Sequence, residues 1–195
     1  MTIAIIGPES TGKTTLCEAL SEHFGCEWIA EYARGYVEQL GRPYTYADVE
    51  QIAQKQVEQL RDYQQNSKEK LLLLDTDLII TKVWFAHVYG RMPEWIDSAI
   101  AEQKIDFYLL LRPDIAWEYD PVRENGDKRE FFYDWYKREI EQTGVPFVEI
   151  GGLGSQRTRN AIEAIEKFSK NFRGKICFSK NKTLKLQSEK IELQP

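Results

Sequence analysis

The amino-acid sequence predicts an α/β fold, in which a parallel β-sheet of about five strands carries helices on both faces. Two observations lead to this prediction. Short apolar runs alternate along the chain with longer segments whose apolar residues recur at helical spacing, and strands joined in this way pair in parallel. The length of 195 residues also suits one such domain with a sizeable core, which we place at residues 1–171.

The elements follow one another in a regular order. The expected strands are short apolar runs rich in leucine or β-branched residues, at 1–6, 26–30, 71–75, 106–111 and 146–150. The expected helices follow from apolar spacing and from end signals such as Gly41 and a cap at Thr45 or Asp48; they lie at 13–24, 31–41, 45–61, 77–90, 93–103, 128–142 and 155–171. Residues 112–127 contain two prolines and several charges, and we expect an exposed loop there. We expect residues 112–129 to form a lid that closes over ATP and substrate.

The stretch from Gly7 to Thr14 reads GPESTGKT and matches the pattern G-x-x-x-x-G-K-[ST]. It follows the first expected strand and opens the first expected helix, so backbone N–H groups and the helix dipole would surround a phosphate. We therefore expect a P-loop NTPase fold. The residues expected to contact the nucleotide in this loop are Gly7, Glu9, Ser10, Thr11, Gly12, Lys13, Thr14 and Thr15. Lys13 would reach the β- and γ-phosphates of ATP, and the Thr14 hydroxyl would bind Mg²⁺.

Ligands of parallel sheets collect at the carboxyl ends of the strands, and Asp75 ends the run LLLLD. We expect Asp75 to be the second Mg²⁺-associated residue; the alternative is that it only caps the next helix. Thr76 and Asp77 follow, where many nucleotide-hydrolysing motors place a water-activating glutamate, so transfer is favoured over hydrolysis. No D-x-x-G sequence occurs, which leaves a GTPase of the usual kind unsupported.

Other charged residues near these strand ends are candidates for catalysis. Glu31 follows the second expected strand, where a carboxylate can deprotonate an attacking hydroxyl, and Arg34 would position charge beside it; the alternative is an exposed helix start. Arg123 and Arg129 are candidates for stabilising the transferred phosphoryl group. Arg112 and Arg157 are expected to contact the nucleotide.

The charge distribution disfavours nucleic acid as a partner. Residues 172–195 contain six Lys/Arg and two Asp/Glu, which leaves 20 basic and 29 acidic residues in 1–171. We interpret the basic tail as solvated or partly disordered; the alternative is a contact with nucleic acid or lipid. No apolar stretch is long enough for a membrane span, no signal peptide is recognisable, and the three cysteines form no C-x-x-C pair. A cytoplasmic protein is expected; the oligomeric state is left open.

Four ordered motifs, GPESTGKTTL, EYAR, LLLLDTDLIITKVW and DFYLLLRPDIAWEYDPVRE, resemble the ribosylnicotinamide kinase domain of a bifunctional bacterial NAD-biosynthesis regulator. The resemblance covers roughly residues 1–170. It implies a nucleoside-kinase-like fold, ATP and Mg²⁺ as cofactors, and phosphorylation of the ribose 5′-hydroxyl of nicotinamide riboside. It places Asp77 and Trp84 near the substrate, and Trp117 and Arg123 in the mobile loop, with Trp117 as a further substrate contact.

The sequence thus predicts an ATP-dependent small-molecule kinase. The cationic ring of nicotinamide riboside suits aromatic faces and carboxylates. Both are expected near the site, from Trp84, Trp95, Trp117, Glu31 and Asp77. One alternative is a nucleotide-binding regulatory ATPase module without kinase turnover. A second alternative, a polynucleotide kinase, fits the acidic body less well.

Overall fold

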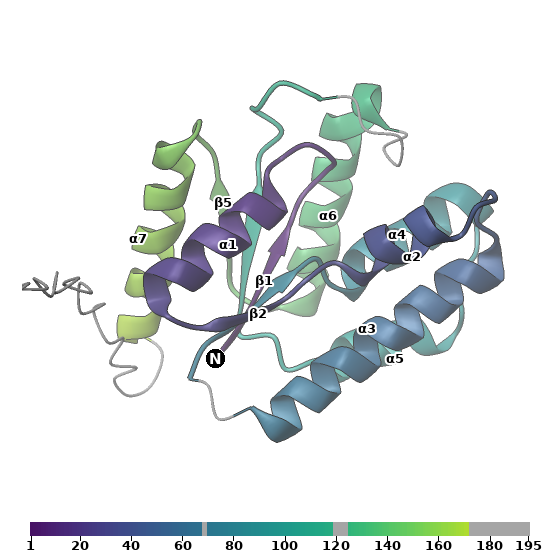
Figure 1. Cartoon of the computed structure of the whole chain (residues 1–195), viewed down its shortest axis with the longest axis horizontal. Helices are drawn as coiled ribbons and strands as arrows, with labels where there is room; N and C mark the ends of the chain where they lie inside the picture. Colours follow the sequence, from purple (N-terminus) through teal and green to yellow (C-terminus); the bar gives the residue numbers. More distant parts are fainter. Residues whose placement is uncertain (68–69, 119–124, 172–195) are drawn as a thin grey trace, which may run out of the picture.

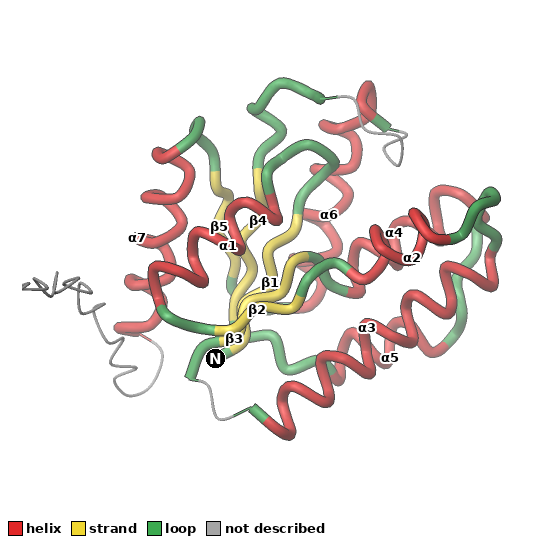
Figure 2. Tube along the Cα trace, in the orientation of Figure 1, coloured by secondary structure: helices red, strands yellow, loops and turns green. Residues whose placement is uncertain are grey.

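The computed structural model describes residues 1–67, 70–118 and 125–171. Its centre is a parallel sheet of five strands in the order β2-β3-β1-β4-β5 (Figures 1 and 2). The strands are β1 (Thr2–Ile6), β2 (Glu27–Ile29), β3 (Leu72–Asp75), β4 (Phe107–Leu111) and β5 (Phe147–Ile150). Every neighbouring pair is parallel, so the predicted α/β fold is confirmed.

The helices also correspond to the predicted ones. They are α1 (Lys13–Phe24), α2 (Tyr32–Gln39), α3 (Tyr46–Asn66), α4 (Leu78–Tyr89), α5 (Trp95–Glu102), α6 (Arg129–Thr143) and α7 (Ser155–Asn171), with a 3₁₀ turn at Gly126–Lys128. Helix α3 begins after a capping box made by Thr45 and Asp48, one of which was the expected cap. It runs five residues past the predicted end at 61, because its last turns pack Tyr63 against the core.

Alternate residues of β1 face the two sides of the sheet. Ile3 and Ile5 pack with α1 and α7, whereas Ala4 and Ile6 pack with α3, α4 and α6. A third apolar cluster joins α3, α4 and α5, which lie together with α2 at the right of Figure 1. The central strands are buried on both faces, as the continuous apolar runs predict.

The strand order determines where the site lies. Because β1 pairs with β3 on one side and with β4 on the other, the loops that follow these three strands meet at one edge of the sheet. The predicted tail at 172–195 and Arg123 lie outside the described residues, and so does the middle of the predicted lid loop. None of the described helices combines the length and the apolar character that a bilayer span requires.

Candidate active site

The loop after β1 has the backbone that a phosphate cradle requires. A Cβ atom on Gly7 would lie 2.9 Å from the carbonyl oxygen of Leu111, so only glycine allows β1 and β4 to approach this closely. Gly12 has a left-handed backbone (φ 76°) at the start of α1, which turns the loop into the helix. The Thr11 hydroxyl donates to the Pro8 carbonyl (2.8 Å) and closes the loop on itself.

The Lys13 side chain lies across this loop. Its ammonium group donates to the carbonyl oxygens of Gly7 (3.0 Å) and Pro8 (3.2 Å). The positive charge is therefore held inside the ring of loop backbone, at the N-terminus of α1. This is where the sequence predicts the phosphate groups of ATP to lie.

Thr14 and Asp75 lie side by side, although 61 residues separate them in the chain. The Thr14 hydroxyl donates to one Asp75 oxygen at 2.6 Å, and the other oxygen, Oδ1, is buried without a partner among the described residues. Burial raises the pKa of Asp75, while the charge of Lys13 lowers it. A hydroxyl and a carboxylate with an unused oxygen are donors that suit Mg²⁺, so these residues fit the ion. The helix-capping alternative does not apply, because the cap of α4 is Asp77.

Glu31 ends the connection from β2 and precedes α2 without making a side-chain capping hydrogen bond. Its pKa is raised, chiefly by burial, and the charges of Lys13, Asp75 and Arg34 all act on it. The fold therefore brings the predicted base close to the lysine and to the predicted metal residue. Arg34 also lowers the pKa of Asp75, and its guanidinium group donates to Glu38 at 3.2 Å.

The Asp77 carboxylate is almost wholly buried, with both oxygens engaged. One accepts from the Ile79 backbone N–H (3.0 Å) and the other from the Tyr108 hydroxyl (2.9 Å). Burial raises its pKa to about 6. Trp84 packs edge-on against Tyr44 in the α3–α5 layer, with ring centroids 4.8 Å apart. Contact of Asp77 or Trp84 with a substrate stays a prediction.

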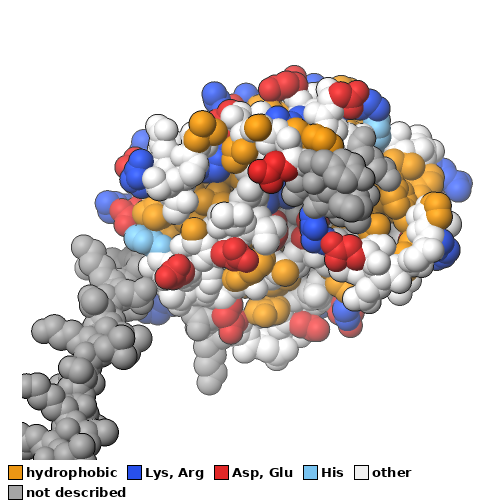
Figure 3. Space-filling view, turned by 45° about the horizontal axis from the view of Figure 1, so that its top comes forward, with side chains coloured by type: hydrophobic (Ala, Val, Ile, Leu, Met, Phe, Trp, Pro, Cys, Tyr) orange, Lys and Arg blue, Asp and Glu red, His pale blue; other side chains and the backbone are white. Residues whose placement is uncertain are grey.

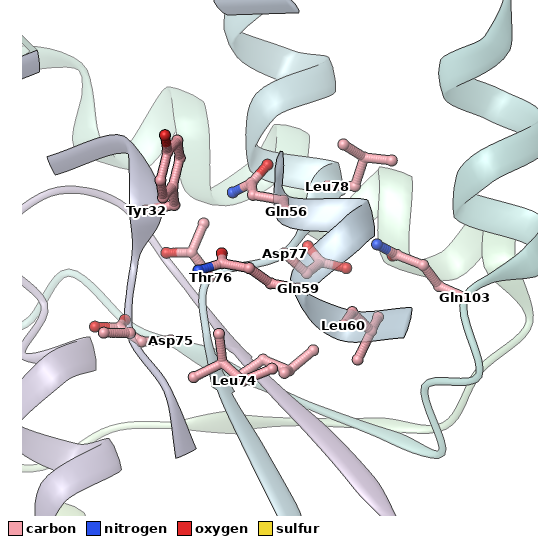
Figure 4. A pocket seen from close by; sticks show the side chains of 12 residues that line it. Tyr32, Gln56, Gln59, Leu60, Leu74, Asp75, Thr76, Asp77, Leu78 and Gln103 are labelled. Atoms are coloured by element: carbon pink, nitrogen blue, oxygen red, sulfur yellow. The ribbon is translucent and has the colours of Figure 1, made fainter. Parts of the chain in front are cut away.

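A cleft opens beside Asp75, between the end of β3, the start of α2 and the inner face of α3 (Figure 4). Polar side chains are frequent in its wall, which is made by Ile29, Ala30, Tyr32, Gln56, Gln59, Leu60, Leu74, Asp75, Thr76, Asp77, Leu78 and Gln103. The Gln56 amide oxygen accepts from the Thr81 hydroxyl at 2.7 Å, which fixes its orientation. This cleft adjoins the Thr14–Asp75 pair, so a molecule bound in it would lie beside that pair, and we refer to it as the acceptor cleft.

The predicted arginines on the other side of the sheet edge have protein partners. Arg112 points to Glu149 on β5 (2.9 Å), with 56% of its side chain exposed. Arg157 is 4% exposed and donates to three backbone carbonyls, of Thr11 (2.7 Å), Gly152 (2.9 Å) and Arg112 (3.1 Å), and to Asp114. Their expected contacts with the nucleotide stay predictions.

Arg129, at the first position of α6, also donates to backbone. Its partners are the carbonyls of Ser10 (3.3 Å), Pro113 (3.2 Å) and Ile115 (2.8 Å). It thus ties the loop after β4 to the phosphate loop. Of the remaining predicted loop residues, Thr15 is exposed on α1. The role of Arg129 in charge stabilisation stays a prediction.

The described ends of the predicted lid loop contact the phosphate loop at further points. The Glu118 backbone N–H donates to Ser10 (3.3 Å), and the Asn125 N–H donates to the Glu9 carboxylate (3.1 Å). The Trp117 ring lies so close to Gly126 that an added Cβ would be 2.7 Å from it.

In Figure 3, Asp/Glu and Lys/Arg side chains of the described residues are interspersed on the visible face.

Sequence reasoning missed most of the acceptor cleft. Gln56 lies on α3 among apolar positions, and a glutamine at such a position is a signal that this face is not only core. Sequence reasoning assigned no role to Tyr32, which follows Glu31. It also gave no role to Thr76, which has a left-handed backbone that its residue type does not reveal.

A sequence profile of the family described as "AAA domain" matches residues 2–157. The chain belongs to this family. The chain is similar to the trifunctional NAD biosynthesis/regulator protein NadR of Escherichia coli, with 29% identity over 155 residues. The aligned region covers 76% of this chain and 38% of that NadR. NadR of Salmonella typhimurium is 28% identical, and the aligned region again covers 76% of this chain and 38% of the relative. The chain spans less than half the length of these relatives. The family resemblance indicated by the motifs is confirmed.

Solved structures show the same fold. NadR in complex with NR matches with a TM-score of 0.72 and 22% identity, over 86% of this chain and 50% of that chain. NadR in complex with NAD and AMP-PNP has a TM-score of 0.69 and 24% identity, over 86% and 49% of the two chains. Deoxyadenosine kinase from M. mycoides, with products dCMP and dCDP bound, has a TM-score of 0.63 and 16% identity, over 86% and 100%. The AAA-domain chain therefore has a P-loop nucleoside-kinase fold.

Proposed function

We propose that this chain is an ATP-dependent kinase that transfers the γ-phosphoryl group to the 5′-hydroxyl of a nucleoside, with nicotinamide riboside as the acceptor. One observation carries the proposal: Lys13, the Thr14–Asp75 pair and Glu31 converge from three separate strand ends beside a polar cleft. The similarity to NadR and the nucleoside-kinase fold support the same reaction.

The phosphate loop would hold the triphosphate. Its backbone N–H groups and the N-terminus of α1 face the phosphates, and Lys13 exchanges its carbonyl partners for phosphate oxygens. Thr14 and Asp75 would hold Mg²⁺, which neutralises the charge that develops on the phosphates during transfer. Two protein oxygens are enough, because Mg²⁺ keeps several waters and phosphate oxygens as ligands.

Glu31 would accept the proton of the attacking hydroxyl. Its raised pKa makes it a better base than an exposed carboxylate, and the positive charges of Lys13 and Arg34 oppose part of that rise. Asp77 is the less suitable base, since both of its oxygens already accept hydrogen bonds. The free, buried thiol of Cys17 fits a reducing compartment, and we place the enzyme in the cytoplasm.

A coupled kinase assay tests the proposal. The purified protein is given ATP and Mg²⁺ with nicotinamide riboside, adenosine, cytidine, an RNA end or no acceptor, and products are identified by mass spectrometry. We expect a nucleoside monophosphate, with the highest kcat/KM for nicotinamide riboside. ATP hydrolysis that no nucleoside stimulates would instead indicate a regulatory ATPase. Phosphorylated RNA ends alone would indicate a polynucleotide kinase.

A further inference from the structure

Three side-chain oxygens of the described residues are buried without a hydrogen-bond partner, and all three belong to residues that line the acceptor cleft. They are Asp75 Oδ1, Thr76 Oγ1 and Gln103 Oε1. Buried polar atoms are almost always paired in native proteins, because an unpaired one loses its hydration without compensation. The cleft therefore has unused hydrogen-bonding capacity. Asp75 Oδ1 is accounted for by the proposed metal site, whereas the Thr76 hydroxyl is not.

The backbone of Thr76 is strained. Its φ of 80° lies in the left-handed region, which is unusual for any residue except glycine and a genuine outlier for a β-branched one. Its N–H donates to the carbonyl of Ile5 at 3.1 Å, which keeps the residue beside β1 in this conformation. Glycine would satisfy the same backbone without strain, so the turn by itself does not explain a threonine here.

The strain has a consequence for the two neighbouring carboxylates. The turn at Thr76 lets Asp75 face Thr14, while Asp77 turns into the fold to cap α4. The Thr76 side chain, which is 6% exposed, remains between them on the cleft wall. Figure 4 shows its hydroxyl pointing to the side of the cleft on which Tyr32 lies.

The available atoms indicate which chemical group would fit. The Gln103 amide oxygen can only accept a hydrogen bond, and the Thr76 hydroxyl can both donate and accept. A partner that brings several hydroxyl groups matches this combination, and the sugar of a ribonucleoside is such a partner. An apolar ring would leave both atoms unpaired.

We propose that the Thr76 hydroxyl binds a 2′- or 3′-hydroxyl of the acceptor's ribose and so favours ribonucleosides over deoxynucleosides. This inference rests on the proposed kinase function and adds a substrate-binding residue to it. The discrimination follows because an acceptor that lacks the hydroxyl leaves the buried Thr76 oxygen unpaired.

The test compares Thr76→Val, which keeps the shape but removes the hydroxyl, with Thr76→Ser, which keeps the hydroxyl. KM is measured for the best ribonucleoside and for its 2′-deoxy and 3′-deoxy analogues. We expect Thr76→Val to raise the ribonucleoside KM by about three- to tenfold, the value of one neutral hydrogen bond, with KM for ATP unchanged. Thr76→Ser should stay near wild type. One deoxy analogue should show the same KM in wild type and in Thr76→Val.

Thr76→Gly is the second variant, because it removes the hydroxyl and the strain together. It should melt no lower than wild type and show the same rise in KM as Thr76→Val. An unchanged ribonucleoside KM in both variants overturns the inference, as does an equal rise for the ribonucleoside and both deoxy analogues. Either result, obtained with an active wild-type kinase, leaves the proposed function intact. A wild-type protein without nucleoside kinase activity refutes the proposed function itself.

Discussion

The two halves of the sheet's carboxyl edge use their charged residues differently. On the β1–β3 side, Asp75 keeps an oxygen without a described partner, and Glu31 is not used to cap its helix. On the β4–β5 side, the guanidinium groups of Arg129 and Arg157 donate hydrogen bonds to backbone carbonyls, including those of Ser10 and Thr11 in the phosphate loop. This difference indicates that a basic residue beside a phosphate loop can stabilise the conformation of the loop through hydrogen bonds to its backbone.

The chemistry of the side chains explains this division. Arginine presents five N–H donors in a rigid fork, so a single buried guanidinium can satisfy several carbonyls that the turns leave unpaired. Arg157 does so for three segments of chain at once. Lysine has a compact ammonium group on a flexible stem, which suits a charge that must move from carbonyl to phosphate.

The largest effect is expected from Lys13→Ala, on the β1–β3 side. Turnover should fall by roughly 10² to 10³, because a charge-stabilising donor is lost. The melting temperature should stay close to wild type, since Lys13 is only half-buried and bonds to its own loop. Steady-state kinetics measure the change, with Lys55→Ala on the exposed face of α3 as the control. Turnover near the wild-type level would mean that this loop is not the catalytic cradle.

The next largest effect is expected from Arg157→Ala, on the β4–β5 side. The free energy of unfolding should fall by about 2 to 4 kcal/mol, because three carbonyls and Asp114 lose their donor. Arg159→Ala, an exposed position on the same helix, should change it by about 0.5 kcal/mol or less. Urea unfolding measures both variants. An unchanged stability together with a raised KM for ATP would instead support the sequence-based prediction of a nucleotide contact.

Glu31→Gln is expected to lower kcat by about 10- to 100-fold, less than many general bases contribute, because phosphoryl transfer has a loose transition state. KM for ATP should stay nearly constant. Because the pKa of Glu31 is raised, wild-type kcat should begin to fall at a higher pH than it would with a glutamate of ordinary pKa as the base. The Glu31→Gln variant should lose this pH dependence. Asp77→Asn should mainly raise KM for the nucleoside. If the two phenotypes are reversed, Asp77 is the base.

The smallest effect concerns the stability of the buried Asp77. Its folded pKa of about 6 lies above the unfolded value, so the folded state binds more protons in this range. Its contribution to stability is therefore present below pH about 4 and is lost as the pH rises through about 6. Asp77→Asn should remove this dependence, which is on the order of 1 to 3 kcal/mol. Urea unfolding between pH 4 and 7 checks it; parallel curves for both proteins would contradict it.

Local patterns were enough to predict the elements and the phosphate side of the site. The glycines and Lys13 stand in one stretch, and Asp75 ends an apolar run, so neither requires knowledge of distant contacts. The contact of Arg112 with Glu149 and that of Arg157 with Thr11 could not be predicted, because the two pairs are 37 and 146 residues apart in the chain. The left-handed backbone of Thr76 is equally invisible, since it depends on the hydrogen bond to Ile5.

The position of Lys13 has a consequence for the thermodynamics of binding. A free lysine side chain carries about 2 kcal/mol of rotamer entropy, which a binding site normally loses when the ligand arrives. In this loop the carbonyls of Gly7 and Pro8 already restrict the ammonium group. Much of that entropy is therefore lost on folding, and a triphosphate has less disorder to remove when it binds.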